Sequence, residues 1–149
     1  MCGIGGFSLS NKSKLNSRQV SNVMLTELER RGNQASGAAW HSSNSVGYIK
    51  HPVAGSRLRL KSMPKKTDAV ILHTRLATHG SINDSRNNHP VISPSGDIQV
   101  VHNGVIYNHD DIRPEIGHSL PPVDSSVIPA LLEAESLDGI SKLDGDAAI

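Results

Sequence analysis

The only cysteine in this 149-residue sequence is Cys2, and three of the four residues after it are glycines. A thiol reacts as thiolate, and its ordinary pKa of about 8.5 leaves only a few per cent ionised near neutral pH, so it needs a base beside it. Removal of Met1 would free the α-amine of Cys2, whose ordinary pKa of about 8 suits a general base. The glycines would let backbone amides and a substrate approach the sulfur. An unreactive thiol in a strand-forming terminus explains these residues equally well.

Arg75 follows an apolar run and opens a loop rich in glycine and asparagine. Site residues often lie on such loops, at the end of a rigid strand. An arginine there could offer a planar pair of donors to a carboxylate, a geometry that lysine cannot reproduce. Arg75 is therefore a candidate anion-binding residue.

The dipeptide Asn103-Gly104 interrupts a β-prone stretch and has two interpretations. Asn-Gly is first of all a signal for a tight hairpin. Alternatively, the Asn103 side-chain amide and the Gly104 backbone N–H are two donors that could converge on an oxygen that becomes negative during a reaction. The two interpretations are compatible.

Length and composition predict one soluble domain with a modest core. A chain of 149 residues suits one domain, and 36% apolar with 3% aromatic residues leaves the core to Val, Ile, Leu and Ala. The net charge is +1 and the basic residues are spread out except at 61–66, which indicates no nucleic-acid partner. One cysteine excludes an internal disulfide, and no targeting, lipidation or membrane-spanning pattern is present. We therefore expect a cytoplasmic protein without membrane contact.

Alternating strand and helix signals predict the order of the elements. Apolar residues at positions 20, 23, 24 and 28 predict an amphipathic helix that starts near Ser17 and ends before Gly32. A second helix is predicted from residue 127, with Ser125 or Ser126 as N-cap and Pro129 in its first turn. Strands are predicted at 4–9, 38–41, 46–49, 69–73, 99–102 and 105–107. Groups of strands between helices indicate a layered α+β fold.

Six blocks of sequence together resemble the class II glutamine amidotransferases, whose glutaminase domain carries an N-terminal nucleophile. In chain order the blocks are MCGIGGF, RGNQASG, HTRLATHG, NNHP, VHNGVIYNH and VDSSVIPALL. The resemblance runs from Cys2 to about Asp146. The block HTRLATHG is nearest to the glucosamine-6-phosphate synthase type, and GVIYNH is similar to the asparagine synthetase type. This resemblance implies an α+β fold of the N-terminal-nucleophile hydrolase class, an αββα sandwich.

The resemblance also implies a reaction. Cys2 would attack the side-chain amide of L-glutamine with its own α-amine as base, giving a glutamyl thioester and ammonia. Water would then release glutamate. Asn103 and Gly104 would be the oxyanion donors, and Arg75 would bind the α-carboxylate of glutamine.

Three further residues complete the implied glutamine pocket. Thr78 and His79 would line it, and Asp124 would receive the α-amino group. One fixed cation and one fixed anion can orient a zwitterion while the thiol addresses its other end. Asp124 could instead be the N-cap of the second helix. Arg31 is expected to support the strand that carries Cys2.

Two features depart from the family pattern. Leu76 stands where the glucosamine-6-phosphate synthase group has tryptophan, so the lid of the pocket is expected to differ. The sequence also ends where the family enters its later strands. We therefore expect residues 1–149 to be a single glutaminase-type domain that is incomplete at its C-terminal end, with the ammonia acceptor on a separate synthase domain or subunit. No cofactor is expected, and a homo-oligomer is left open.

Other classes of function remain open. Five of the eight histidines lie between residues 73 and 109, but no HExxH motif is present and the only cysteine is terminal, so no metal site is predicted. A non-catalytic, glutaminase-like binding or interaction module is the main alternative. A different amidohydrolase with an N-terminal nucleophile would share Cys2 but not the pair of Arg75 and Asp124, and this pair discriminates between them.

Overall fold

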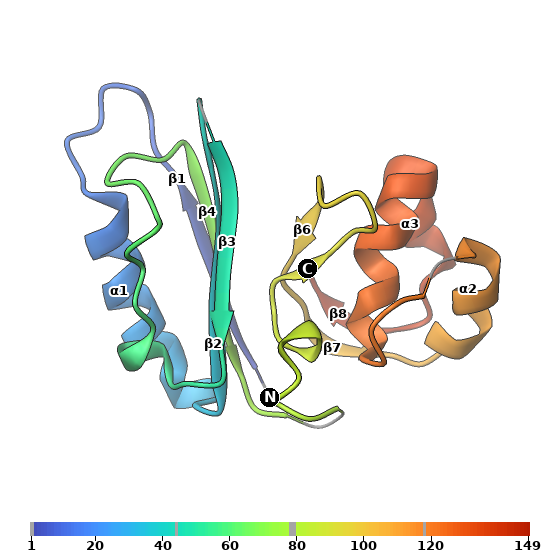
Figure 1. The fold of residues 1–149 in the computed structure, drawn as a ribbon. Helices are drawn as coiled ribbons and strands as arrows, with labels where there is room; N and C mark the ends of the chain where they lie inside the picture. The colour runs from blue at the N-terminus through green and yellow to red at the C-terminus, as the bar shows by residue number, and fades with distance from the viewer. Residues whose placement is uncertain (1, 44, 78–79, 118) are drawn as a thin grey trace.

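Four layers of secondary structure stack across the molecule (Figure 1). The computed structural model describes residues 2–43, 45–77, 80–117 and 119–149. Helix α1 (Ser17–Leu28) covers one face of a four-stranded sheet, a second β layer lies against the other face, and α2 (His109–Ile116) and α3 (Val127–Glu135) cover that layer (Figure 1). The order helix, sheet, sheet, helix confirms the predicted αββα architecture.

The four-stranded sheet is antiparallel and places Cys2 beside Arg75. Its strands are β1 (Gly3–Ser8), β2 (Ala35–Ser42), β3 (Ser45–His51) and β4 (Ala69–Arg75), in the spatial order β1-β4-β2-β3. All four were predicted, although β2, β3 and β4 are longer than predicted and β1 lies one residue earlier in the chain. Gly3 pairs with Thr74, so Cys2 lies across from Arg75 at the same end of the sheet.

Helix α1 packs on the sheet through a face that overlaps the predicted one only in part, since Met24 and Leu28 pack against the core as predicted. Its buried residues are Ser17, Ser21 and Leu25, whereas Val23, which was predicted to face the core, is 67% exposed. Asn16 is the N-cap, and its side-chain oxygen accepts from the backbone N–H groups of residues 18 and 19. The two serines are small, so they let the start of the helix approach its neighbours closely. Ser17, Ser21 and Leu25 stand at i, i+4 and i+8, so they share one face of the helix.

The second β layer is made of four short strands in two pairs. They are β5 (Val91–Ile92) with β6 (Gln99–Val100), and β7 (Asn103–Ile106) with β8 (Gly145–Ala148). The Asn-Gly hairpin prediction is wrong, because Asn103 and Gly104 begin β7 and pair with Ala148 and Ala147, about 40 residues further along the chain. The pairing of β7 with a distant strand overrides the local turn preference.

Helix α3 was predicted and α2 was not. Helix α2 contains Pro114 and few apolar residues, so its sequence has no clear helical periodicity. Ser126 is the N-cap of α3 but makes no side-chain capping hydrogen bond, and Pro129 lies in the first turn, as predicted. In the described ranges no helix is long and apolar enough to cross a membrane. Short 3-10 helices occupy Glu29–Arg31, Gly55–Arg57, Ser85–Asn87, Asp124–Ser126 and Ser136–Lys142.

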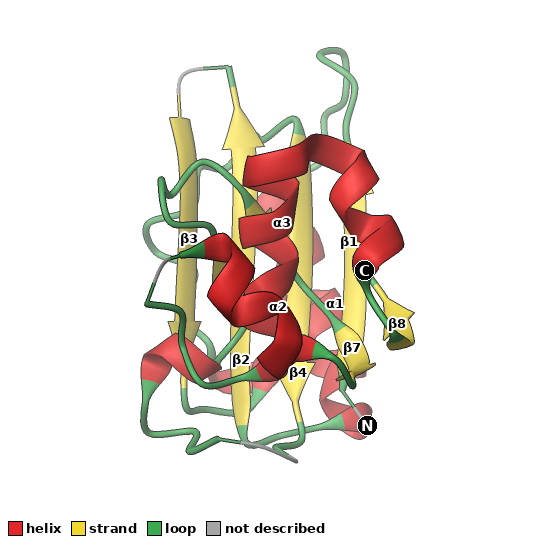
Figure 2. Ribbon diagram, turned by 90° about the vertical axis from the view of Figure 1, so that its right-hand side faces the viewer, coloured by secondary structure: helices red, strands yellow, loops and turns green. Residues whose placement is uncertain are grey.

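Two apolar cores hold the outer layers, and a polar interior lies between the β layers. One core joins α1 to the four-stranded sheet around Leu25 and Leu72, and the other joins α2 and α3 to the second β layer around Ile106 and Ile128. Seen from the α2 and α3 side, these helices lie across the middle strands of the sheet (Figure 2). We call the polar interior the central seam. It comprises His73, Arg75, Asn88, His89, His102 and Asp124, each at most 8% exposed.

Candidate active site

Cys2 is held at the end of β1 by contacts from two other segments. Its backbone N–H donates to Asn103 Oδ1 at 3.0 Å, and Arg31 Nε donates to its carbonyl oxygen at 3.0 Å. The Arg31 contact is the supporting role predicted for that residue. Because a backbone N–H can only donate, the Asn103 amide must turn its oxygen toward Cys2 and keep its Nδ2 group as a donor. The nitrogen that would act as base therefore already contacts the residue expected to supply an oxyanion donor.

Gly104 occupies a position that no other residue could take without rearrangement. Its φ of +153° lies outside the region that side chains favour, and a Cβ on it would lie 1.7 Å from the carbonyl oxygen of Asp146. The residue is solvent-exposed, next to Asn103 at the start of β7. The two expected oxyanion donors are therefore consecutive, at a backbone position set by the pairing of β7 with β8.

The glycines after Cys2 have a packing role that the sequence analysis did not assign to them. A Cβ on Gly3 would lie 2.6 Å from Thr74 Oγ1 and 2.9 Å from the carbonyl oxygen of Leu28. A Cβ on Gly6 would lie 2.8 Å from the carbonyl oxygen of Val70. These glycines let β1 lie close against β4 and α1, rather than opening space for a substrate beside the sulfur.

Arg75 is buried in the central seam with a defined orientation. Its Nη1 donates to Asn88 Oδ1 at 2.7 Å, and its Nη2 donates to the carbonyl oxygen of Gly80 at 3.3 Å. Burial lowers the pKa of Arg75, and the nearby Cys2 and Asp124 oppose that shift. The guanidinium keeps its charge at neutral pH because its pKa starts above 12.

Asp124 faces the second β layer instead of capping a helix. Its Oδ2 accepts from the backbone N–H of Ile106 at 2.9 Å, and the residue is 8% exposed. The N-cap interpretation is therefore wrong. An open pocket of about 270 Å³ lies beside it, lined by Val105, Ile106, Tyr107, His109, Pro122 and Asp124. The second oxygen of the carboxylate, Oδ1, accepts a long 3.5 Å contact from Ser125 Oγ.

Three buried histidines of the central seam, His73, His89 and His102, pack together. The rings of His73 and His89 stack with centroids 4.1 Å apart, and the ring of His102 lies 6.4 Å from that of His89. His73 Nε2 donates to the carbonyl oxygen of His102 at 3.1 Å, which ties β4 to the segment before Asn103. Burial lowers the pKa of His73 to about 3, and it also lowers the pKa of His89 and His102. The cluster is therefore uncharged at neutral pH.

Two residues beside Arg75 had no role assigned from the sequence. Asn88 is 1% exposed, and its Nδ2 donates to the carbonyl oxygen of Ile82 at 2.7 Å while its Oδ1 accepts from Arg75. Lys50 Nζ donates to the carbonyl oxygens of Asn88 and Pro90, both at 2.8 Å. Asn88 stood in a recognised block, whereas nothing in the sequence around Lys50 signalled its contacts.

The structure brings together Cys2, Asn103, Gly104 and Arg75, with Asp124 close enough to influence the charge of Arg75. Thr78 and His79 lie outside the described residues, so their predicted place in the pocket stays a prediction.

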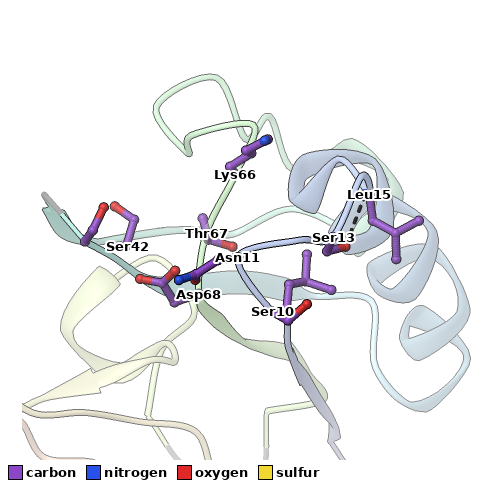
Figure 3. Close-up of a pocket in the computed structure, with 10 residues that line it drawn as sticks. Ser10, Asn11, Ser13, Leu15, Ser42, Lys66, Thr67 and Asp68 are labelled. Atoms are coloured by element: carbon purple, nitrogen blue, oxygen red, sulfur yellow. Dashed lines mark hydrogen bonds between the residues drawn. The ribbon is translucent and has the colours of Figure 1, made fainter.

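A second pocket lies at the opposite end of the four-stranded sheet and contains none of these residues (Figure 3). It has a volume of about 210 Å³. Lys66 extends away from Asp68, so the ammonium and carboxylate do not converge on a ligand (Figure 3). The residues that line this second pocket are Leu9, Ser10, Asn11, Ser13, Leu15, Ser42, Ser43, Lys66, Thr67 and Asp68.

The αββα order of the four layers is the fold of the N-terminal-nucleophile glutaminases. A solved structure of glutamine phosphoribosylpyrophosphate amidotransferase from B. subtilis superposes with a TM-score of 0.72 at 20% identity, over 99% of this chain and 33% of that one. Another, described as the allosteric regulatory enzyme of purine biosynthesis, gives a TM-score of 0.73 at 19% identity, over 99% of this chain and 34% of that one.

Sequence comparison names the family. Residues 73–149 match the glutamine amidotransferase domain, and the chain belongs to this family. A glutamine–fructose-6-phosphate aminotransferase (isomerizing) of Sulfurisphaera tokodaii is 38% identical in an alignment 140 residues long that covers 89% of this chain and 23% of that protein. The protein of the same name from Halobacterium salinarum is 33% identical over 150 residues, 96% of this chain and 23% of its own length. The chain thus spans about a quarter of the length of these relatives.

Proposed function

We propose that residues 1–149 form one glutaminase-type domain, which hydrolyses the side-chain amide of L-glutamine and supplies ammonia to a synthase domain or subunit. The observation that carries this proposal is the 3.0 Å hydrogen bond from Cys2 N to Asn103 Oδ1. It joins the nucleophile, the nitrogen that would be its base and an oxyanion donor in one contact. Membership of the glutamine amidotransferase domain family supports the same reaction.

The first half of the reaction forms a thioester. In the chain that starts at Cys2, the α-amine takes the thiol proton and the thiolate attacks the δ-carbon of glutamine. The carbonyl oxygen becomes an oxyanion that Asn103 Nδ2 and the Gly104 N–H stabilise. The tetrahedral intermediate then collapses, and the α-ammonium returns its proton to the departing nitrogen, which leaves as ammonia.

The second half restores the enzyme. The α-amine accepts a proton from a water molecule, whose oxygen attacks the thioester carbon. The same two donors stabilise the second oxyanion, and the C–S bond breaks as the proton returns to the sulfur. The products are glutamate and free Cys2, and no redox partner or cofactor enters the balance.

Charged groups in the seam suit the two charged groups on the α-carbon of glutamine. The Arg75 guanidinium lies across from Cys2 and would bind the α-carboxylate, while Asp124 Oδ1 would accept from the α-amino group. Opposite charges at fixed positions orient the substrate so that its amide faces the thiol. Thr78 and His79 are proposed to complete this pocket.

Ammonia release from glutamine tests the proposal, on a preparation whose mass confirms that Met1 has been removed. Wild-type protein is expected to release ammonia and glutamate in equal amounts, and Cys2→Ser is expected to lose at least about a thousandfold in kcat with unchanged thermal unfolding. Processed wild type that releases no ammonia but binds glutamine would support a binding module instead. Activity retained in Cys2→Ser would exclude Cys2 as the nucleophile.

A further inference from the structure

The segment between β4 and β5 holds Arg75 in place, and one lysine from a different strand holds that segment. Arg75 lies at the end of β4, and its guanidinium donates to two acceptors in this segment, Asn88 Oδ1 and the Gly80 carbonyl oxygen. Of these two contacts the one to Asn88 is the shorter, at 2.7 Å, and it is buried. The position of Asn88 therefore helps to set the orientation of the guanidinium.

Asn88 is fixed on every side by hydrogen bonds. Both ends of its side-chain amide are paired, because Oδ1 accepts from Arg75 and Nδ2 donates to Ile82 O at 2.7 Å. Its backbone N–H donates to Ser85 O at 3.1 Å, and its carbonyl oxygen accepts from Lys50 Nζ. A buried amide with both ends paired has one stable orientation.

Lys50 joins this segment to the far edge of the four-stranded sheet. It lies on β3, and its ammonium donates to the carbonyl oxygens of Asn88 and Pro90, both at 2.8 Å. Hydrogen bonds from a charged donor are about twice as strong as neutral ones. Lys50 therefore fixes the residues on both sides of His89, and with them the partner of Arg75.

We propose that Lys50 is a positioning residue for substrate binding, acting through Asn88 on the orientation of Arg75. The proposal rests on the proposed function, in which Arg75 binds the α-carboxylate of glutamine. Lys50 touches no substrate atom in this scheme. Its removal should weaken glutamine binding and leave the chemistry at Cys2 nearly intact.

The charge on Lys50 adds a signature that a purely structural side chain lacks. Burial lowers the pKa of Lys50 to about 8, and Asp84 opposes that shift. The other groups that face it are the Tyr48 ring, 5.9 Å away on its own strand, and the buried His89, whose pKa is lowered. Lys50 is therefore mostly charged at pH 7 and mostly neutral at pH 9, so its hold on the two carbonyl groups weakens within this interval.

The experiment measures KM and kcat for glutamine in processed full-length chains. Lys50→Met is expected to raise KM about tenfold at pH 7 and to change kcat less than about twofold. Lys50→Arg keeps a charged donor and should stay within about threefold of wild type. Asn88→Asp places a carboxylate on Arg75 Nη1 that competes with the substrate, so its KM should rise more than in Lys50→Met. Lys66→Met, at the opposite end of the sheet, is the matched control and should change neither constant.

The pH dependence separates positioning from general loss of structure. Between pH 7 and 9, KM of the wild type should rise by a larger factor than KM of Lys50→Arg, whose charge does not titrate in that range. The Cys2 amine and the amino group of glutamine titrate equally in both chains, so they cancel in the ratio. If Lys50→Met does not fold, this ratio decides the matter.

The outcomes distinguish the two proposals. An active wild type with equal pH profiles in wild type and Lys50→Arg, or with an unchanged KM in a folded Lys50→Met, overturns the positioning role alone. A processed wild type that neither releases ammonia nor binds glutamine in calorimetry overturns the proposed function and this inference with it.

Discussion

Leu72 and His73 are consecutive residues of β4, both fully buried, yet they face two different interiors. Leu72 packs in the apolar core under α1. His73 stacks on His89 in the central seam and donates to His102 O. Because successive side chains of a strand point to opposite faces, a single strand contributes to both.

The two interiors differ in what they can do for the protein. Apolar burial contributes about 25 cal/mol per Å² and does not depend on direction, so a core stabilises layers without specifying where donors point. A buried polar group, by contrast, costs free energy unless its partner is in place. The seam is therefore suited to holding Arg75 and the segment before Asn103 in one arrangement. Substitutions on the two faces should separate stability from activity.

The largest effect is expected at Asn103, whose side chain contacts Cys2. Asn103→Ala removes the Nδ2 donor and should lower kcat by about 100- to 1,000-fold, because one oxyanion donor contributes about that much. Steady-state ammonia release is the measurement, with thermal unfolding as a check on the fold. Asn103→Asp keeps the acceptor for Cys2 N but lacks the donor, so it should be at least as impaired. Normal kcat in Asn103→Asp would show that this side chain does not stabilise an oxyanion.

The converse effect is expected at Leu72, on the core side of the same strand. Leu72→Ala should lower the free energy of unfolding by about 2–5 kcal/mol, the usual cost of a cavity in a packed core. Denaturant titration measures it, and kcat per folded molecule should stay within about twofold. Val23→Ala, on the exposed face of α1, is the control and should cost less than about 0.5 kcal/mol. An unchanged stability in Leu72→Ala would contradict the division between core and seam.

A smaller effect is expected when Arg75 keeps its charge but loses its geometry. Arg75→Lys should raise KM for glutamine by about 10- to 100-fold with a lesser change in kcat, because an ammonium lacks the planar fork with which a guanidinium can contact Asn88, Gly80 and a carboxylate in fixed directions. Arg30→Lys is the matched control, since the Arg30 side chain is 80% exposed and pairs with Glu27 at the surface. A KM within twofold of wild type would argue against a carboxylate site at Arg75.

Local sequence signals were enough for the four-stranded sheet but for only part of the second β layer, where the strands predicted at 99–102 and 105–107 overlap β6 and β7 and nothing predicted β5 or β8. Strands β1 to β4 are long runs of β-prone residues, so each could be predicted from its own stretch of sequence. Strands β5 and β6 have two residues each, and β7 depends on β8 from the other end of the chain. Such pairing leaves no local pattern, which is why Asn103-Gly104 was taken first for a hairpin. Helix α2 was missed because Pro114 interrupts its pattern.

The candidate reactive residues could be proposed from their types, whereas the residue proposed to orient Arg75 could not. A lone terminal thiol, an Asn-Gly pair and an arginine at a strand end each have few chemical uses, so Cys2, Asn103 and Arg75 could be proposed from sequence. Lys50 acts on two main-chain carbonyl oxygens, and any residue supplies a carbonyl. Its proposed role could be inferred only from the structure, in which Lys50 on β3 contacts the segment that ends at Pro90.

Acid should weaken the seam more than the cores, because its histidines are buried without charge. The pKa of His73 is lowered to about 3, whereas an unfolded histidine titrates near 6.5. Below pH 6.5 the unfolded chain therefore binds more protons than the folded one, and the stability that is fully present above pH 6.5 is lost as the pH falls toward 3. Each such ring contributes a slope of up to about 1.4 kcal/mol per pH unit.

Denaturant titrations at pH 7, 6, 5 and 4.5 would measure this slope for wild type, His73→Gln and Leu72→Ala. In His73→Gln one titrating ring is gone, so the loss of stability per pH unit below 6.5 should be shallower by about that amount, even if the variant is less stable at pH 7. In Leu72→Ala the whole curve should move down in parallel, because the core contains no titrating group. Carboxylates titrate alike in all three chains. A His73→Gln curve parallel to wild type would mean that the ring is not held neutral, and that the two faces of β4 do not differ in their response to acid.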